Sequence, residues 1–400
     1  MNLFRKTSLM LAVFLLVLVT GCSSTPEVTP VQPEADSSLQ PTEGQPTQQP
    51  TLPPTQPPNT AVPREVFDFS TTAFGFFPTP PEPDPRSTTK TIKAMKDHAD
   101  VLLFQEPVPW TDFVDGADVE SSSITRIADL TDYIQFYGMQ PIMVVDPLNG
   151  LNRREFQGIP EEWEAADFST PEVRKAYQNF AVRLAREFQP RYLGLASEIN
   201  TYLDAYPEDG EQFLSLYQET YAAVKEVSPD TQVFVTFQWD DLNRLDGDGE
   251  RFDIKWDQVE AFEPRLDIWA ISSYPHFFFD SPSDVPEDYY TPLLKRTEKP
   301  LAVAEGGWTS QEAGGRPGTP DGQVEHLHRI DRQLGDRLVF WINLLYADLD
   351  WPAYSAIFAE QGMEEDMNSL SNFIYLGLVE TDGTPKPALK AWDELRAESR

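Results

Sequence analysis

From about residue 66 onward, short apolar runs alternate with longer segments whose apolar residues recur every three to four positions. Runs unbroken by polar residues are typical of parallel strands buried on both faces, and the longer segments predict amphipathic helices. Strands are predicted at 73–77, 101–105, 141–145, 192–196, 232–237, 266–271, 301–305 and 337–345. Helices are predicted near 88–98, 124–137, 171–188, 213–224, 256–262, 288–296, 324–334 and 387–396.

This alternation predicts an α/β fold of the (β/α)8 TIM-barrel class. Eight strand–helix units within about 335 residues match the usual size of that barrel. The alternative is an open doubly wound sheet, but the first predicted strand is not followed by a glycine-rich phosphate-binding turn. Neither an internal repeat nor a second globular domain is evident in the sequence.

The N-terminal segment, residues 1–22, reads as an export signal. Arg5 and Lys6 precede a short apolar run, and the sequence then reaches Val19-Thr-Gly-Cys22, which resembles the lipobox of bacterial lipoproteins. A spanning helix would need about 20 apolar residues, more than this run provides. We therefore expect lipidation at Cys22 and a location in the cell envelope, facing the exterior or the periplasm.

Residues 23–65 are rich in Pro, Thr, Gln and Ser, and they predict an extended, disordered tether. This segment lacks the apolar groups that would stabilise a packed structure. We expect it to hold the globular domain, residues 66–400, away from the membrane.

The composition excludes several classes of function. A net charge of −34 argues against binding nucleic acid or anionic lipid, so membrane contact is expected only through the N-terminal lipid. Cys22 is the only cysteine, which excludes an intrachain disulfide and a cysteine-based metal site. We expect neither a metal nor a cofactor, and His326 and His328 are expected to be solvated.

Two predicted strands end in a glutamate: Glu198 follows the fourth strand, and Glu305 ends the seventh, before Gly-Gly-Trp308. A buried carboxylate is costly unless it has a task, and the C-terminal ends of barrel strands carry the active site. One carboxyl can protonate a glycosidic oxygen while the other attacks the anomeric carbon. A separation of about 5 Å would give retention of configuration, and ~6.5–9.5 Å would give inversion.

These motifs resemble the clan of retaining glycoside hydrolases built on (β/α)8 barrels. The likeness covers residues 66–400 and is sharpest at Ala304-Glu-Gly-Gly-Trp308 and Ser197-Glu198, with support from Asp267-Ile-Trp-Ala-Ile-Ser-Ser-Tyr-Pro275 and from the C-terminal Gly377–Trp392 segment. Endo-β-1,4-galactanases are among the closer matches. The resemblance implies a glycoside hydrolase that acts on a polysaccharide, with Glu198 as acid/base, Glu305 as nucleophile and Tyr274 hydrogen-bonded to the nucleophile.

The chain departs from the clan at two points. Ser197 stands where the clan usually has an asparagine that holds the sugar 2-hydroxyl, so that contact would be weakened, moved to Asn200, or absent. The basic residue often found near strand two or three has no evident match. An alternative function is therefore a catalytically impaired glycan-binding lipoprotein on the same barrel. A metal-dependent hydrolase is the third hypothesis, with little support from four histidines.

Other residues after strand ends are candidates for binding a carbohydrate polymer or oligosaccharide. Asp146 and Asn149 could bind hydroxyls, although capping a loop is an equal alternative. Aromatic rings there could stack on sugar faces or pack between loops. The aromatic candidates are Trp110, Trp239, Tyr274, Trp308 and Trp351.

Overall fold

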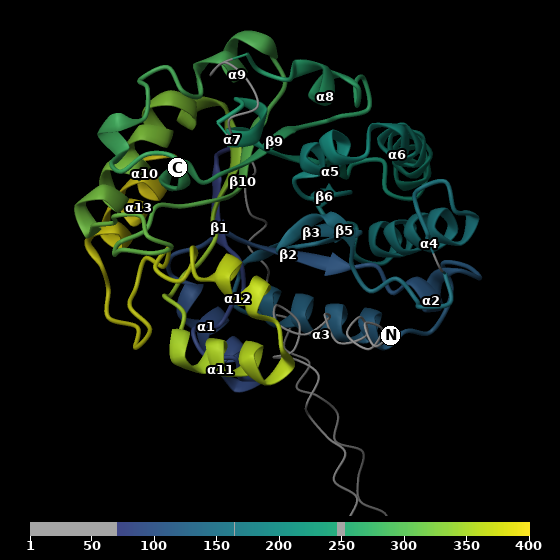
Figure 1. The fold of residues 1–400 in the computed structure, drawn as a ribbon, viewed down its shortest axis with the longest axis horizontal. Coiled ribbons are helices and arrows are strands. Elements are labelled where there is room, and N and C mark those ends of the chain that lie inside the picture. The colour runs from purple at the N-terminus through teal and green to yellow at the C-terminus, as the bar shows by residue number, and fades with distance from the viewer. Residues whose placement is uncertain (1–69, 164, 246–252) are drawn as a thin grey trace, which may run out of the picture.

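The computed structural model describes residues 70–163, 165–245 and 253–400 (Figure 1). The predicted export signal, Cys22 and the predicted tether therefore lie outside the described residues. Within the described part of the chain, none of the helices is long and apolar enough to cross a membrane.

Parallel strands form a barrel, in the order β7-β6-β3-β2-β1-β11-β10-β9-β8. Every neighbouring pair in this sheet is parallel. The bounds are β1 Ala73–Phe76, β2 Val101–Pro107, β3 Gln140–Asp146, β6 Tyr192–Gly194, β7 Gln232–Phe234, β8 Thr236–Gln238, β9 Trp269–Ser273, β10 Leu301–Gly306 and β11 Leu338–Asn343.

The nine segments correspond to the eight predicted strands, because the fifth is divided at Val235. Its first half, β7, pairs with β6, and its second half, β8, pairs with β9. The fifth strand thereby joins the two ends of the sheet, and the barrel is closed through it. The prediction of a (β/α)8 barrel is confirmed.

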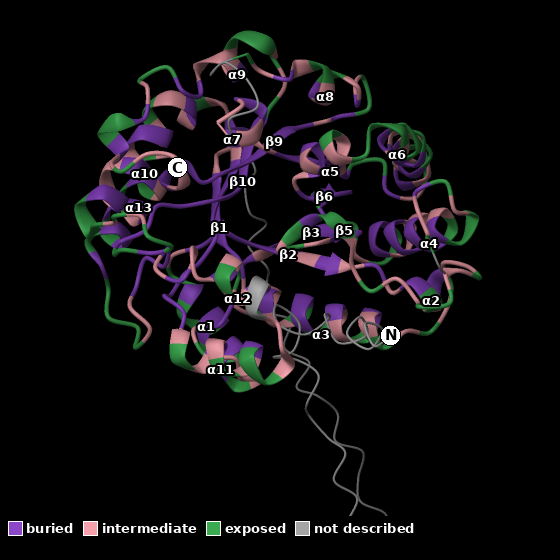
Figure 2. Cartoon of the chain, viewed as in Figure 1, coloured by how far each residue is buried: buried purple, intermediate pink, exposed green. Residues whose placement is uncertain are grey.

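Helices surround the barrel, and their inner faces are buried against the strands (Figure 2). The predicted helices are present as α1 Pro85–Met95, α3 Ser122–Phe136, α4 Pro171–Phe188, α6 Pro207–Val227, α8 Trp256–Glu260, α9 Thr291–Arg296, α10 Pro320–Leu334 and α13 Pro387–Glu398. Several begin at a polar cap followed by proline, as at Asp84 and Thr319, whose side chains accept from backbone N–H groups.

A glycine allows the first two strands to approach each other. Gly75 pairs with Val101, and a Cβ atom at position 75 would lie only 2.1 Å from the Val101 carbonyl oxygen. Any other residue there would force β1 and β2 apart.

The loops contain further short helices and a hairpin that the hydrophobic periodicity did not predict. They are the helices α2 Trp110–Phe113, α5 Ile199–Ala205, α7 Trp239–Leu242, α11 Trp351–Gln361 and α12 Glu364–Leu370, and the hairpin of β4 Leu148–Asn149 and β5 Asn152–Phe156. Figure 1 shows α11 and α12 on the side of the barrel where α1 and α3 lie. Asp350 and Tyr354 fasten α11 to the segment after β1, through hydrogen bonds to the carbonyls of Pro81 and Pro80.

Candidate active site

Glu198 follows β6 and is the residue immediately before α5. Its backbone is left-handed, with φ of 47°, and its N–H donates to Thr236 Oγ1 at 2.8 Å. This conformation is uncommon for a residue other than glycine and is typical of functional positions. The Glu198 carboxylate accepts hydrogen bonds from Ser272 Oγ and, at 3.1 Å, from Arg153 Nε.

Glu305 lies in β10, at the far side of the same site. Its Oε1 accepts from Ser197 Oγ at 2.7 Å and from the Gln105 amide, and its Oε2 accepts from the Tyr274 hydroxyl at 3.1 Å. The contact from Tyr274 is the one that the resemblance implied.

The electrostatic environment of Glu305 is set by burial and by charge. Burial and the neighbouring charge of Glu198 raise the pKa of Glu305 to about 7, against the opposing effects of Arg153 and the Ser197 hydrogen bond. A carboxyl with this pKa changes its ionisation near neutral pH, as titrating groups at active sites often do.

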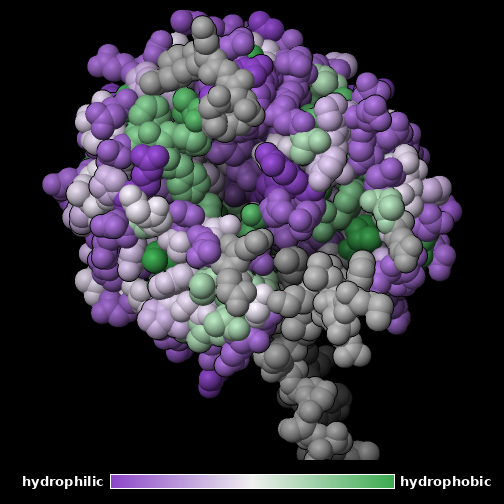
Figure 3. Space-filling model, in the orientation of Figure 1, coloured by the Kyte–Doolittle hydropathy of each residue, from purple (hydrophilic) through white to green (hydrophobic). Residues whose placement is uncertain are grey.

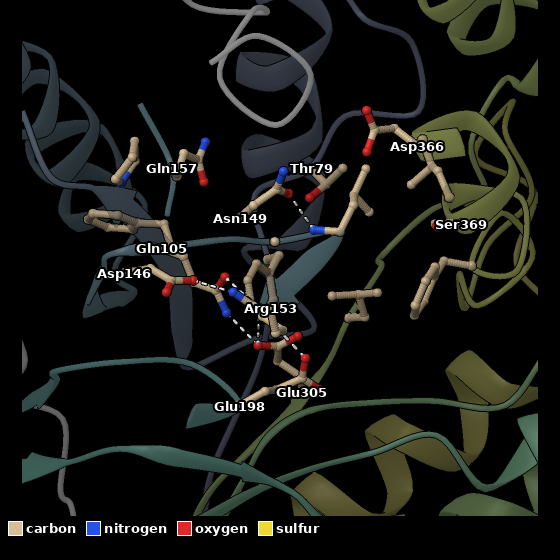
Figure 4. Close-up of a pocket in the computed structure, with 18 of the residues that line it drawn as sticks. Thr79, Gln105, Asp146, Asn149, Arg153, Gln157, Glu198, Glu305, Asp366 and Ser369 are labelled. Atoms are coloured by element: carbon tan, nitrogen blue, oxygen red, sulfur yellow. Dashed lines mark hydrogen bonds and ion pairs between the residues drawn. The ribbon is translucent and has the colours of Figure 1, made fainter. Parts of the chain in front are cut away.

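Arg153, in β5 of the hairpin that follows β3, connects the two glutamates (Figure 4). Its Nη2 lies 3.9 Å from Glu305 Oε1, and its Nη1 donates to the buried carboxylate of Asp146. The residue is only 8% exposed, so its charge acts in a largely desolvated site. Sequence reasoning missed Arg153 because the short β4–β5 hairpin that carries it has no apolar periodicity. The only feature of the sequence that pointed to this residue is its position, a positively charged side chain soon after the third predicted strand.

The two glutamates open into a cavity of about 430 Å³. Five of the residues that the sequence predicted for the site line it: Glu198, Glu305, Asp146, Asn149 and Tyr274. Figure 3 shows this face of the molecule hollowed near its centre. Ser197 is fully buried beneath the site and reaches it through its hydrogen bond to Glu305.

Asn200 does not line the cavity. It is fully buried, and its amide bridges to Gln238 and Asp241: Nδ2 donates to Asp241 Oδ2 at 2.7 Å, and Oδ1 accepts from Gln238 N–H at 2.8 Å. These bonds tie α5 to β8 and α7. Asn200 therefore stabilises the backbone behind Glu198. Its burial gives no support to the alternative in which the sugar contact moves from position 197 to Asn200.

The four predicted tryptophans are likewise outside the cavity lining. Trp110 is buried and donates to the Gln157 carbonyl at 2.7 Å, and Trp351 begins α11. Trp239 is fully buried against Tyr290, and Trp308 packs on the rings of two histidines. The aromatic lining comes instead from Phe77, Phe104, Tyr274, Phe277 and Phe373.

The expectation of solvated histidines was wrong for His326. It is 1% exposed beneath Trp308, and burial lowers its pKa to about 3. The apolar stripe of α10 extends over this position, which turns the ring inward. Among the described residues, no group of three or more His, Cys, Asp or Glu side chains could hold a metal ion.

Comparison with known proteins supports the fold. No family model matches the sequence. No curated protein matches it either. Solved structures do share the barrel, and those with similar folds include several glycoside hydrolases.

One is the exo-β-1,4-mannosidase Op5Man5 from Opitutaceae bacterium strain TAV5, with 15% identity and a TM-score of 0.60 over 82% of this chain and 60% of that one. A GH5_18 protein from Streptomyces cattleya, solved in complex with GlcNAc, shows 17% identity and a TM-score of 0.59 over 82% and 80% of the two chains. A family 39 glycoside hydrolase from Bacteroides cellulosilyticus WH2 shows 16% and 0.53 over 83% and 64%. The match spans less than two thirds of the mannosidase and of the family 39 enzyme, and at these identities the likeness shows the fold.

Proposed function

We propose that this chain hydrolyses β-glycosidic bonds with retention of configuration. The observation that carries the proposal is that two glutamates, the partly buried Glu198 after the fourth barrel strand and the buried Glu305 in the seventh, contact one guanidinium and line one cavity. Such a pair can divide acid and nucleophile roles between its members.

Glu305 is the proposed nucleophile. Three donors, from Gln105, Ser197 and Tyr274, fix the orientation of its carboxylate and stabilise its ionised form. Attack on the anomeric carbon forms a glycosyl ester and removes the negative charge of Glu305.

Glu198 is the proposed acid and base. In the first step its carboxyl protonates the leaving oxygen, and in the second its carboxylate takes a proton from water that attacks the ester. Arg153 donates to Glu198 at 3.1 Å, and this hydrogen bond orients the carboxyl group of Glu198 in the site.

The substrate is proposed to be a β-linked carbohydrate. The sequence resemblance pointed to a polysaccharide and to galactanases, whereas the named structural neighbours include a mannosidase and a complex with GlcNAc. The cavity lining has no tryptophan among its described residues, which gives a galactan chain no particular support. We therefore propose the bond type, and a release assay against a panel of glycosides identifies the sugar.

A second candidate is a glycan-binding protein with impaired turnover. Two observations favour it: Ser197 bonds to Glu305 where the clan uses asparagine for the substrate, and Arg153 lies against both carboxylates. If that guanidinium stays in place when sugar binds, the reaction would lack a free acid.

The cellular location is proposed from the sequence. We propose that Cys22 is lipidated and that residues 23–65 tether the barrel to a membrane of the cell envelope, facing the exterior or the periplasm.

The test is a release assay of the full-length protein against β-glucosides, β-mannosides, β-galactosides and the corresponding polymers. Glu305→Gln should abolish release while retaining binding, and Glu198→Gln should slow it by about 10²–10⁴-fold. Glu260→Gln, at a surface ion pair with Arg296, is the matched control and should behave as the native protein.

If no substrate of the panel is hydrolysed but one glycan retards the protein on an affinity gel, the glycan-binding hypothesis would replace the hydrolase hypothesis. Neither release nor retention would remove the carbohydrate assignment for that panel.

A further inference from the structure

The cavity that contains the two glutamates has a second, apolar part. We name it the apolar chamber and define it by Phe77, Leu130, Leu151, Met363, Leu370 and Phe373. These side chains come from the end of β1, from α3, from the β4–β5 hairpin, and from α12 with the residues that flank it. Leu151, Met363 and Phe373 are only partly buried, so the structure leaves apolar surface facing the cavity.

Polar residues from the same elements also line this part of the cavity: Thr79 after β1, Asp366 and Ser369 in α12, and Asn372 just after it. Arg126 is paired with the buried carboxylate of Glu106. The hydroxyl of Thr88 is buried and has no hydrogen-bond partner among the described residues, although Thr88 belongs to the cavity lining.

Charge restricts the ligand. The described lining residues include five carboxylates, at Glu106, Asp146, Glu198, Glu305 and Asp366, and two guanidinium groups, at Arg126 and Arg153. A cavity with this excess of acidic groups would repel a phosphate, a sulfate or a carboxylate. The ligand should therefore be uncharged in the part that enters the chamber.

A further stretch of sugar units fits the chamber poorly. Sugar hydroxyls that face the six apolar side chains of the chamber would lose their hydrogen bonds to water, and only those next to Thr79, Asp366, Ser369 or Asn372 could replace them. A chamber with apolar walls and a few polar groups is typical of sites for small amphipathic ligands, and its cavity of about 430 Å³ lies within their usual range.

We propose that the apolar chamber binds the apolar part of a neutral glycoside while the sugar lies at Glu198 and Glu305. The substrate class is then an amphiphilic alkyl, acyl or aryl glycoside. This inference rests on the proposed function, because it extends the same site.

The experiment measures binding of n-alkyl β-thioglycosides, which resist hydrolysis, from methyl to octyl and below their micelle concentrations. Glucosides, mannosides and galactosides are titrated calorimetrically into the full-length protein, purified without alkyl-glycoside detergent. Each additional methylene should tighten binding about three- to fourfold until the chamber is full.

Met363→Gln places an amide of similar size in the chamber and should flatten this dependence on chain length. Met367→Gln is the matched control, because Met367 lies in α12, is half-buried and does not line the cavity. It should leave the dependence unchanged.

Dissociation constants that do not depend on chain length would overturn the proposal, as would equal effects of the two glutamine variants or no binding of any octyl glycoside. The chamber and the reaction are tested separately. Chain-length-dependent binding without hydrolysis of the corresponding O-glycosides supports the chamber and contradicts the hydrolase. Hydrolysis of the O-glycosides without any dependence of binding on chain length supports the hydrolase and contradicts the chamber.

Discussion

Arg153 and Glu198 form an ion pair in which Nε donates to Oε2 at 3.1 Å, and the same guanidinium lies 3.9 Å from Glu305. One buried cation thus acts on both carboxylates of the proposed mechanism. It also donates to Asp146, so three acidic groups share its charge. The ionisation of the site therefore depends on a side chain from a loop as well as on the barrel strands.

Replacing Arg153 by methionine should move the pH dependence of the reaction. Arg153 lowers the pKa of Glu305, so its loss should raise that pKa and shift the acidic limb of kcat/KM to higher pH. It should also destabilise the fold by about 3–5 kcal/mol, because three carboxylates lose their cation. Arg153→Lys retains the charge and is the control. An acidic limb at the same pH in Arg153→Met would contradict the role given to this residue.

The native protein should gain activity as pH rises through neutrality. The pKa of Glu305 is about 7, and the proposed nucleophile acts in its ionised form, so the acidic limb of kcat/KM should have an apparent pKa of about 7, in a profile that falls again at higher pH because the first step needs a protonated acid. A rate profile that is flat between about pH 5 and pH 8 would count against Glu305 as the nucleophile.

The same pKa has a consequence for stability. The pKa of Glu305 is higher in the folded protein than in the unfolded chain, so protonation of Glu305 stabilises the fold. This contribution to the free energy of unfolding is fully present below pH ~4.5 and is lost as pH rises through about 7. Glu305→Gln removes this ionisation, so its free energy of unfolding should not fall with the native protein's as pH rises. From pH 4 to pH 8 the free energy of unfolding of the variant, relative to that of the native protein, should increase by on the order of 3 kcal/mol. Urea unfolding of both proteins at the two pH values measures this difference, and an equal gap at both would refute it.

Ser197 should affect turnover through Glu305. Its hydroxyl donates to Oε1 at 2.7 Å, and this hydrogen bond favours the ionised carboxylate. Ser197→Ala should therefore raise the apparent pKa of the acidic limb and cost about 1.5–3 kcal/mol of transition-state stabilisation, or roughly 10–150-fold in kcat/KM. Ser197→Thr keeps the hydroxyl and serves as the comparison. A loss of binding with an unchanged pH profile would instead indicate that Ser197 contacts the sugar.

The barrel could be predicted because strands buried on both faces leave continuous apolar runs, and each of the eight was found. The division of the fifth strand at Val235 could not, because both halves are apolar and only the pairing with β6 and β9 separates them. The helices α11 and α12 escaped prediction for a related reason. The packing of α11 against the segment after β1 depends on contacts distant in sequence, such as Tyr354 to Pro80, and α12 packs on α11.

The two glutamates could be predicted because each ends an apolar strand, where a carboxylate has no structural reason to be. The predicted tryptophans also follow strands, but that position does not fix the direction of a ring. Trp239 turned into the core, and Trp110 turned towards the Gln157 carbonyl. Arg153 carried no periodic signal, and only the β4–β5 hairpin brings it to the site.

The C-terminal segment is held by a buried ion pair whose loss should be measurable. Lys386 Nζ lies 2.6 Å from Asp348, also donates to Ser310 Oγ and the Gly377 carbonyl, and both charged side chains are at most 3% exposed. Lys386→Met should cost up to about 3–5 kcal/mol of stability at alkaline pH, because Asp348 is then left as an uncompensated buried charge or must take up a proton.

The Asp348→Leu and Lys386→Met double variant should recover most of that loss, because it removes both charges. Burial raises the pKa of Asp348 to about 7 even beside Lys386, so the Lys386→Met variant can relieve its defect by protonating Asp348. Its deficit relative to the native protein should therefore shrink as pH falls from 8 to 5. A deficit that is constant across this range would show that the loss comes from packing.

Cys22→Ser should change where the protein is found. If Cys22 is the site of lipidation, the native chain should fractionate with membranes in a bacterial host and incorporate labelled fatty acid. Cys22→Ser should remove the label, and Ser23→Ala, a change at the adjacent residue, should retain it. Label that persists in Cys22→Ser would show that the envelope anchor proposed for residues 1–22 is wrong, without affecting the proposed reaction at Glu198 and Glu305.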